Sequence, residues 1–198
     1  MTLELGSTGK KIIHKAQLLL QERGYQFFSF QDLADSVGIR KASVHHYFKS
    51  KEELARMMIV DYRVRLQAWA DEIDSRSMNH RQKLQAYFEM FSALSKNGKN
   101  VCPGGSLLLD WNNFSKSIQG ELQELLKLHH RWLTKLLEEA IALKASPLKS
   151  SEISGHVLLI GSSIQGGLQL ARANVDSEKF LRQLFKQIDR ITFERTDL

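Results

Sequence analysis

Residues 24–54, GYQFFSFQDLADSVGIRKASVHHYFKSKEEL, contain two short segments of helical pattern separated by a tight turn. We expect Ser29 to cap the first helix, with Asp32 as the acid of a capping box three residues later. This helix should end at Gly38, because a glycine suits a backbone position that needs a positive φ. A second short helix is predicted over about 41–47. The stretch therefore predicts two short helices joined by a tight turn.

The second of these helices combines an apolar inner face with a basic surface. Val44 and Phe48 lie four residues apart and share the inner face, so the polar side chains are left at the sides and outward. From residue 36 to 51 there is no acid, and the bases are Arg40, Lys41, Lys49 and Lys51. Such a run is usually only a solvated surface. In this context it indicates a helix-turn-helix, whose second helix enters the DNA major groove. A generic three-helix cluster with a polar surface is the alternative.

The rest of the chain also has helical periodicity, so the predicted fold class is all-α. Apolar residues recur at helical spacing, and only two prolines occur in 198 residues. Further helices are predicted over about 9–23, 50–73, 82–96, 106–114, 119–144, 152–174 and 177–194. We expect residues 1–55 to form a helix-turn-helix DNA-binding domain and residues 56–198 a helical regulatory and dimerisation domain.

Composition and motif content narrow the function classes. The formal net charge of +6 fits a polyanionic partner. No apolar run approaches the roughly 20 residues of a membrane span, and no secretory signal precedes the first helix, so we expect a cytoplasmic protein. We find no phosphate-binding loop, Ser-His-Asp set or metal cluster, and expect neither a cofactor nor enzymatic activity. A helical enzyme and an unregulated DNA-architectural protein are the alternatives.

The stretch quoted above resembles the DNA-binding domain of the tetracycline-repressor (TetR) family. The matching elements are GY at 24–25, the cap Ser29, DLA at 32–34, GI at 38–39 and HYFKSKEEL at 46–54. The resemblance implies a homodimeric transcription regulator, usually a repressor, that leaves a palindromic operator when a small effector binds. It also implies that the last two helices form the dimer.

The resemblance assigns DNA contacts residue by residue. Lys41 and Ser43 match recognition-helix positions that contact DNA, and Tyr47 and Lys51 match positions that bind phosphate. Ser29 matches a capping hydroxyl that also approaches the DNA backbone.

Two positions depart from the family pattern. Arg40 stands where a Ser or Thr usually caps the helix predicted over about 41–47. His45 stands where tyrosine is common in the family. The predicted DNA-binding residues are Ser29, Arg40, Lys41, Ser43, His45, His46, Tyr47 and Lys51.

The C-terminal part has more aromatic surface than a minimal core needs, and pockets are mostly apolar with a few polar groups. The residues predicted to bind an effector are Phe88, Phe91, Cys102, Trp111, Phe114, His129 and Trp132. Simple core packing is the alternative for each of them. Cys102 is the single cysteine, and some family members carry an electrophile-sensing cysteine in about this region. Its alternative role is that of a small buried hydrophobe.

Several glycines lie in the predicted helix 152–174, where glycine lowers helix stability but allows two helices to approach closely. The residues predicted at a four-helix dimer interface are Gly161, Leu168, Leu181, Leu184, Phe185 and Ile188. Close packing within one subunit is the alternative explanation for the glycines.

Overall fold

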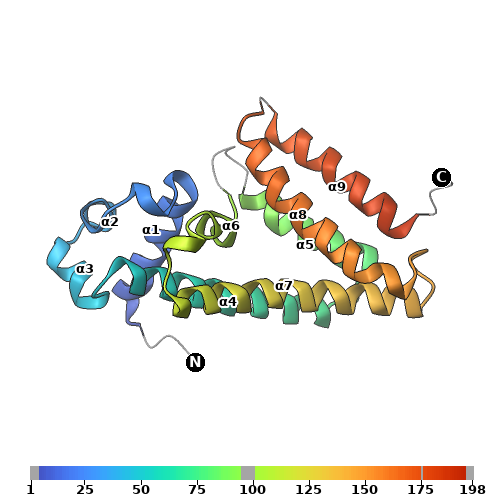
Figure 1. Ribbon diagram of the computed structural model, residues 1–198, viewed down its shortest axis with the longest axis horizontal. Helices are drawn as coiled ribbons and strands as arrows, with labels where there is room; N and C mark the ends of the chain where they lie inside the picture. The colour runs from blue at the N-terminus through green and yellow to red at the C-terminus, as the bar shows by residue number, and fades with distance from the viewer. Residues whose placement is uncertain (1–4, 95–100, 175, 195–198) are drawn as a thin grey trace. The chain divides into compact units, whose positions relative to one another are not determined.

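The computed structural model describes residues 5–94, 101–174 and 176–194. The regular structure of these residues is helical with no strand among them, which confirms the predicted all-α fold. With η marking a 3-10 helix, the elements are α1 (Ser7–Arg23), η1 (Tyr25–Phe27), α2 (Phe30–Val37), α3 (Lys41–Tyr47), α4 (Lys51–Ser75), α5 (His80–Leu94), α6 (Pro103–Leu108), η2 (Trp111–Asn113), α7 (Lys116–Ala142), η3 (Ser150–Glu152), α8 (Ile153–Ala171) and α9 (Ser177–Phe193) (Figure 1).

The described residues form two compact units. Unit 1 comprises those up to Leu66 together with Pro103–Leu125, and unit 2 comprises those of Gln67–Cys102 and from Leu126 onward. Helices α4 and α7 each contribute residues to both units. Within the described ranges, we find no helix with the length and apolar character that a membrane crossing requires.

In unit 1, α1 packs against α2, and α2 packs against α3. The buried face of α1 contains the residues expected from its periodicity: Ile12, Ile13, Ala16, Leu19 and Leu20. The predicted capping box begins α2. The Ser29 hydroxyl accepts a hydrogen bond from the Asp32 N–H at 3.2 Å, and the Asp32 carboxylate accepts one from the Ser29 N–H at 2.7 Å. This reciprocal pair satisfies two N–H groups that a helix start leaves without partners.

The turn between α2 and α3 depends on Gly38, which has φ 77° and ψ 39°. The N–H groups of Gly38 and Ile39 both donate to the Ala34 carbonyl, at 2.9 and 3.0 Å. From α1, Lys11 Nζ donates to the Val37 carbonyl at 3.2 Å. A Cβ at Gly38 would meet no atom within 4 Å. The backbone conformation alone therefore favours glycine at this turn.

Unit 2 contains α5, α8, α9 and parts of α4 and α7. Helix α8 packs along α9, and both contact α5 (Figure 1). Phe88 of α5 stacks on Phe185 of α9 with ring centroids 4.6 Å apart. At Gly167 of α8, an added Cβ would overlap the Leu184 side chain of α9. This glycine therefore serves packing within one subunit.

The end of α4 is fixed to its neighbours in unit 2 by aromatic and ionic contacts. Trp69 lies 5.2 Å from Trp132 of α7, measured between ring centroids. Asp74 pairs with Lys83 of α5 at 3.2 Å and with Lys135 of α7 at 2.9 Å. These contacts hold α4, α5 and α7 together.

One predicted element was wrong. A helix was expected over about 106–114, but α6 spans Pro103–Leu108 and the separate turn η2 follows. Proline is well suited to the first helical position, since its missing N–H would have no helical partner there. The predicted helix 82–96 corresponds to α5, and its last two positions lie outside the described residues.

Candidate functional site

The outer surface of α3 contains the polar residues predicted to meet DNA. Val44 and Phe48 are buried, as expected from their spacing. Lys41, His45 and His46 are exposed, and Ser43 and Tyr47 are half-buried at the sides. The helix is therefore fixed from within while its basic face remains open to a ligand.

Two ring contacts orient the side chains of α3. The His45 ring lies 4.8 Å from the Phe30 ring of α2 in a T-shaped arrangement. Tyr47 lies close to Gly9 of α1, where an added Cβ would come within 3.3 Å of the tyrosine ring. The absence of a side chain at Gly9 therefore gives Tyr47 room against α1, a role that the sequence analysis did not identify.

Arg40 occupies the N-cap of α3 without capping it. Its backbone has φ −76° and ψ 145°, the extended conformation usual for a cap, but its side chain makes no capping hydrogen bond. The residue is exposed at the start of the helix. The helix therefore has no side-chain cap at the position where the family pattern has a Ser or Thr, and the long cation remains available at the helix start.

The Lys51 ammonium is engaged within unit 1. Its Nζ donates to the Phe28 carbonyl and lies 4.7 Å from the Tyr25 ring centroid and 4.5 Å from that of Phe28. Partial burial lowers the pKa of this amine. A phosphate contact by the ammonium requires it to leave or share this site, whereas the start of α4 presents backbone N–H groups directly.

The same region matches a known family. Residues 12–58 match the family described as "Bacterial regulatory proteins, tetR family". A TetR transcriptional regulator from Legionella pneumophila has a similar structure, with a TM-score of 0.85 and 28% identity over 96% of this chain and 100% of that one. The chain belongs to the TetR family. It is a transcriptional regulator with a helix-turn-helix DNA-binding region.

Two curated relatives agree with this assignment. An HTH-type transcriptional regulator in the lacX 3′ region of Lactococcus lactis subsp. lactis is 24% identical over 178 residues, covering 87% of each chain. The IcaR negative transcriptional regulator of the biofilm operon icaADBC in Staphylococcus epidermidis is 39% identical over 49 residues, 25% of this chain and 26% of that protein. The matched proteins are named as regulators rather than enzymes.

The structure distributes the residues predicted to bind an effector over both units of this TetR-family regulator. Trp111 and Phe114 belong to unit 1, where the Phe114 ring packs against that of Tyr25 at 4.9 Å. The other five, Phe88, Phe91, Cys102, His129 and Trp132, belong to unit 2. Of the seven, only Phe91 and His129 line the cavity between α5, α7 and α8.

That cavity has a volume of about 360 Å³. Its buried wall contains Tyr87, Phe91, Leu133, Val157 and Ile164. The other lining residues are Leu126, His129, His130, Leu158, Gly161, Ser162 and Gln165. A volume of this order is in the range of small-molecule sites.

Tyr87 and His129 form the polar centre of the cavity wall. The Tyr87 hydroxyl and His129 Nδ1 share a hydrogen bond of 2.8 Å. Burial lowers the pKa of His129 to about 4, and burial also raises the pKa of Tyr87 well above its usual range. Both groups are therefore neutral near pH 7. Behind them, the Trp132 ring stacks on Tyr87 at 5.1 Å.

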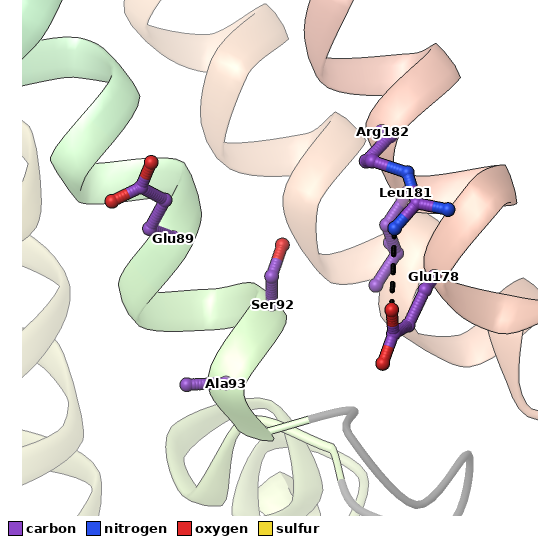
Figure 2. A pocket seen from close by; sticks show the side chains of 6 residues that line it. All are labelled: Glu89, Ser92, Ala93, Glu178, Leu181 and Arg182. Atoms are coloured by element: carbon purple, nitrogen blue, oxygen red, sulfur yellow. Dashed lines mark hydrogen bonds and ion pairs between the residues drawn. The ribbon is translucent and has the colours of Figure 1, made fainter.

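A second hollow lies between α5 and α9 and has a different chemistry (Figure 2). Its lining includes Glu89 on one side and the ion pair of Arg182 with Glu178, 3.2 Å apart, on the other. An adjoining hollow shares Glu89 and Arg182 and adds Lys186 and Asp189. Unlike the cavity between α5, α7 and α8, these surfaces are rich in charge.

Most residues predicted at a dimer interface are buried within the subunit. The buried residues of this set are Leu168, Leu181, Phe185 and Ile188. Gly161 and Leu184 are half-buried. Three leucines of α8 that were not predicted at the interface are exposed: Leu158, Leu159 and Leu170. Gly155 and Gly166 also face open space on this helix.

Proposed function

We propose that this TetR-family regulator is a sequence-specific repressor whose helix α3 reads the DNA major groove. The observation that carries the proposal is the exposed basic face of α3, which buried Val44 and Phe48 hold in place after the Gly38 turn. Lys41 and Ser43 would contact base edges, since they lie near the N-terminus of α3. In this proposal residues 1–55 bind DNA and residues 56–198 regulate and dimerise.

The remaining predicted DNA contacts would position the protein on the duplex. Arg40, His45, His46 and Tyr47 surround the base-reading residues, and Ser29 is exposed at the start of α2. Lys51 would act on phosphate together with the N-terminus of α4. These contacts supply affinity without sequence information.

We propose that the active form is a homodimer on a palindromic operator. Gly155, Leu159, Ser162, Gly166 and Leu170 recur at helical spacing along α8, and each is exposed. An exposed stripe of small residues and leucines on a helix is suited to a twofold-related copy of itself. Half-sites about one helical turn apart, or somewhat more, would follow from that symmetry.

We propose that a small molecule controls DNA binding, and that it enters the cavity between α5, α7 and α8. Phe91 and His129, both predicted effector contacts, line this cavity. Sensing of electrophiles by Cys102 is the alternative, although its thiol is buried. We place this activity in the cytoplasm, where the chromosome of a bacterium lies.

Selection of bound DNA from a random pool tests the central proposal. We expect a palindrome, with full affinity only when both half-sites are present. Lys41→Ala should change the selected bases, whereas Lys49→Ala, an exposed cation outside α3, should leave them unchanged. Binding that ignores sequence would instead favour an unregulated DNA-architectural protein.

A further inference from the structure

The cavity between α5, α7 and α8 is lined without a formal charge. The described residues around it include no lysine, arginine, aspartate or glutamate. Most of its inner wall is apolar, with Phe91, Leu133 and Val157 buried. An ionic ligand would therefore lose its hydration here without gaining a counter-ion, which is costly.

The hydrogen-bonding groups of the inner wall are suited to a neutral partner. The Tyr87 hydroxyl has one donor and two acceptor lone pairs, and the bond to His129 uses only one of these capacities. If Tyr87 donates to His129, its oxygen can still accept a hydrogen bond from a ligand. If it accepts from His129, its hydroxyl can donate to one. A ligand hydroxyl can both donate and accept, so it can form a hydrogen bond with Tyr87 in either arrangement.

The charged hollows between α5 and α9 give an internal comparison. There Arg182 and Glu178 are exposed and pair with each other, and Lys186 lies on the same helix. Charged side chains are thus available elsewhere in unit 2, but none of them is among the described residues that line the cavity between α5, α7 and α8. The neutrality of this cavity is a local feature.

We propose that the effector is an uncharged, mainly apolar molecule with a hydroxyl group, and that the Tyr87–His129 pair binds this hydroxyl. The inference rests on the proposed effector control and specifies its ligand class. It excludes organic acids and amines as tight ligands of this cavity. It also assigns a ligand-orienting role to Tyr87.

Calorimetric titration of the full chain at pH 7 with matched naphthalene probes tests the ligand class. The probes are 2-naphthol, 2-naphthoate and 2-naphthylmethylammonium, which share a ring system and differ in charge. We expect 2-naphthol to bind at least about tenfold more tightly than either ion, because an ion in the cavity loses hydration without compensation. Equal or tighter binding of an ion, or no binding of 2-naphthol, overturns the proposal.

Two glycine variants test whether 2-naphthol binds in the cavity between α5, α7 and α8. A Cβ at Gly161 meets open space, so the side chain of Gly161→Leu can enter the cavity without disturbing the helix. We expect this variant to lose 2-naphthol binding. Gly120→Leu is the matched control, because Gly120 of α7 also faces open space but does not line the cavity. Arg182→Gln, in the charged hollow, should also bind 2-naphthol normally.

Tyr87→Phe tests the orienting role. We expect it to weaken 2-naphthol binding about fivefold to tenfold, the usual value of one hydrogen bond, and to leave the binding of unsubstituted naphthalene unchanged. An equal loss of affinity for 2-naphthol and for naphthalene would show that Tyr87 contributes packing contacts and no hydrogen bond to the ligand. Because these titrations contain no DNA, they are independent of operator recognition. A DNA selection that shows no sequence specificity would contradict the proposed function but would not bear on the ligand class of the cavity.

Discussion

His129 and His130 are neighbours on α7 with different surroundings. His129 lies against Tyr87 and Phe91 in the cavity wall, with its ring centroid 5.9 Å from that of Tyr87 and 5.8 Å from that of Phe91. His130 is exposed at the rim. Adjacent residues on a helix point about 100° apart, so this difference follows from helix geometry. The pair allows a cavity histidine to be compared with a surface one.

The first prediction concerns stability in acid. Burial lowers the pKa of His129 to about 4, below the value of about 6.5 expected in the unfolded chain. Between these values the unfolded state binds more protons. The free energy of unfolding should therefore fall as pH drops from about 6.5 towards 4, by up to about 3 kcal/mol from this group.

Urea denaturation across this pH range measures the effect. His129→Gln should lose less stability on acidification than the unmodified chain, whereas His130→Gln should behave like the unmodified chain. His156, whose pKa is also lowered by burial, is present in both variants and cancels in the comparison. The same pH dependence in both variants would show that His129 is not the source of the loss of stability in acid.

At the scale of elements, the sequence predicted the helix-turn-helix closely because its ends carry local signals. Ser29 and Gly38 act through their own backbone neighbours, so no tertiary information was needed. The cavity could not be predicted in the same way. Tyr87, Phe88 and Phe91 occur within two turns of α5, and only the packing of α8 and α9 shows that Phe88 meets α9 while the other two face the cavity. The exposed leucines of α8 were missed for the same reason.

The second prediction separates helix capping from DNA contact at Arg40. Arg40→Ser places a good cap residue on an extended backbone that has no capping hydrogen bond, so it should stabilise the protein by about 1 kcal/mol. It also removes a cation from the proposed DNA surface. The slope of log affinity against log salt should fall by about one if Arg40 neutralises a phosphate.

Arg40→Ala is the control, because it removes the charge without supplying a cap. It should show the same reduced salt slope as Arg40→Ser but no gain in stability. Denaturation and salt-dependent DNA titration give the two readouts. If Arg40→Ser and Arg40→Ala are equally stable, the α3 cap is not limiting.

For the whole molecule, the third prediction concerns the dimer. Leu159 and Leu170 are 42% and 62% exposed on the same side of α8. The double variant Leu159→Asp, Leu170→Asp should yield folded monomers, since two buried charges without partners are costly in an interface. Sedimentation equilibrium measures the mass. Leu143→Asp, at a leucine that is 71% exposed beyond the end of α7, is the control and should remain dimeric. A dimer in the double variant would exclude this face.

The last prediction concerns how the effector and DNA influence each other. The proposed DNA contacts lie in unit 1 and the cavity lies in unit 2, while α4 is one continuous helix with residues in both. Linkage requires the effector to weaken DNA binding by the same factor by which DNA weakens effector binding. The corresponding coupling free energy is typically about 1–3 kcal/mol.

Gln67 and Ala68 are exposed residues of α4 where unit 2 begins. Replacing both with glycine lowers helix stability by about 1 kcal/mol at each position without removing a buried contact. We expect this double variant to bind DNA alone and 2-naphthol alone normally, but to show a coupling factor closer to one. Gln67→Ala keeps the helix intact and should retain the full coupling. Unchanged coupling in the double glycine variant would mean that α4 does not transmit the response, and would direct attention to α7, the other helix with residues in both units.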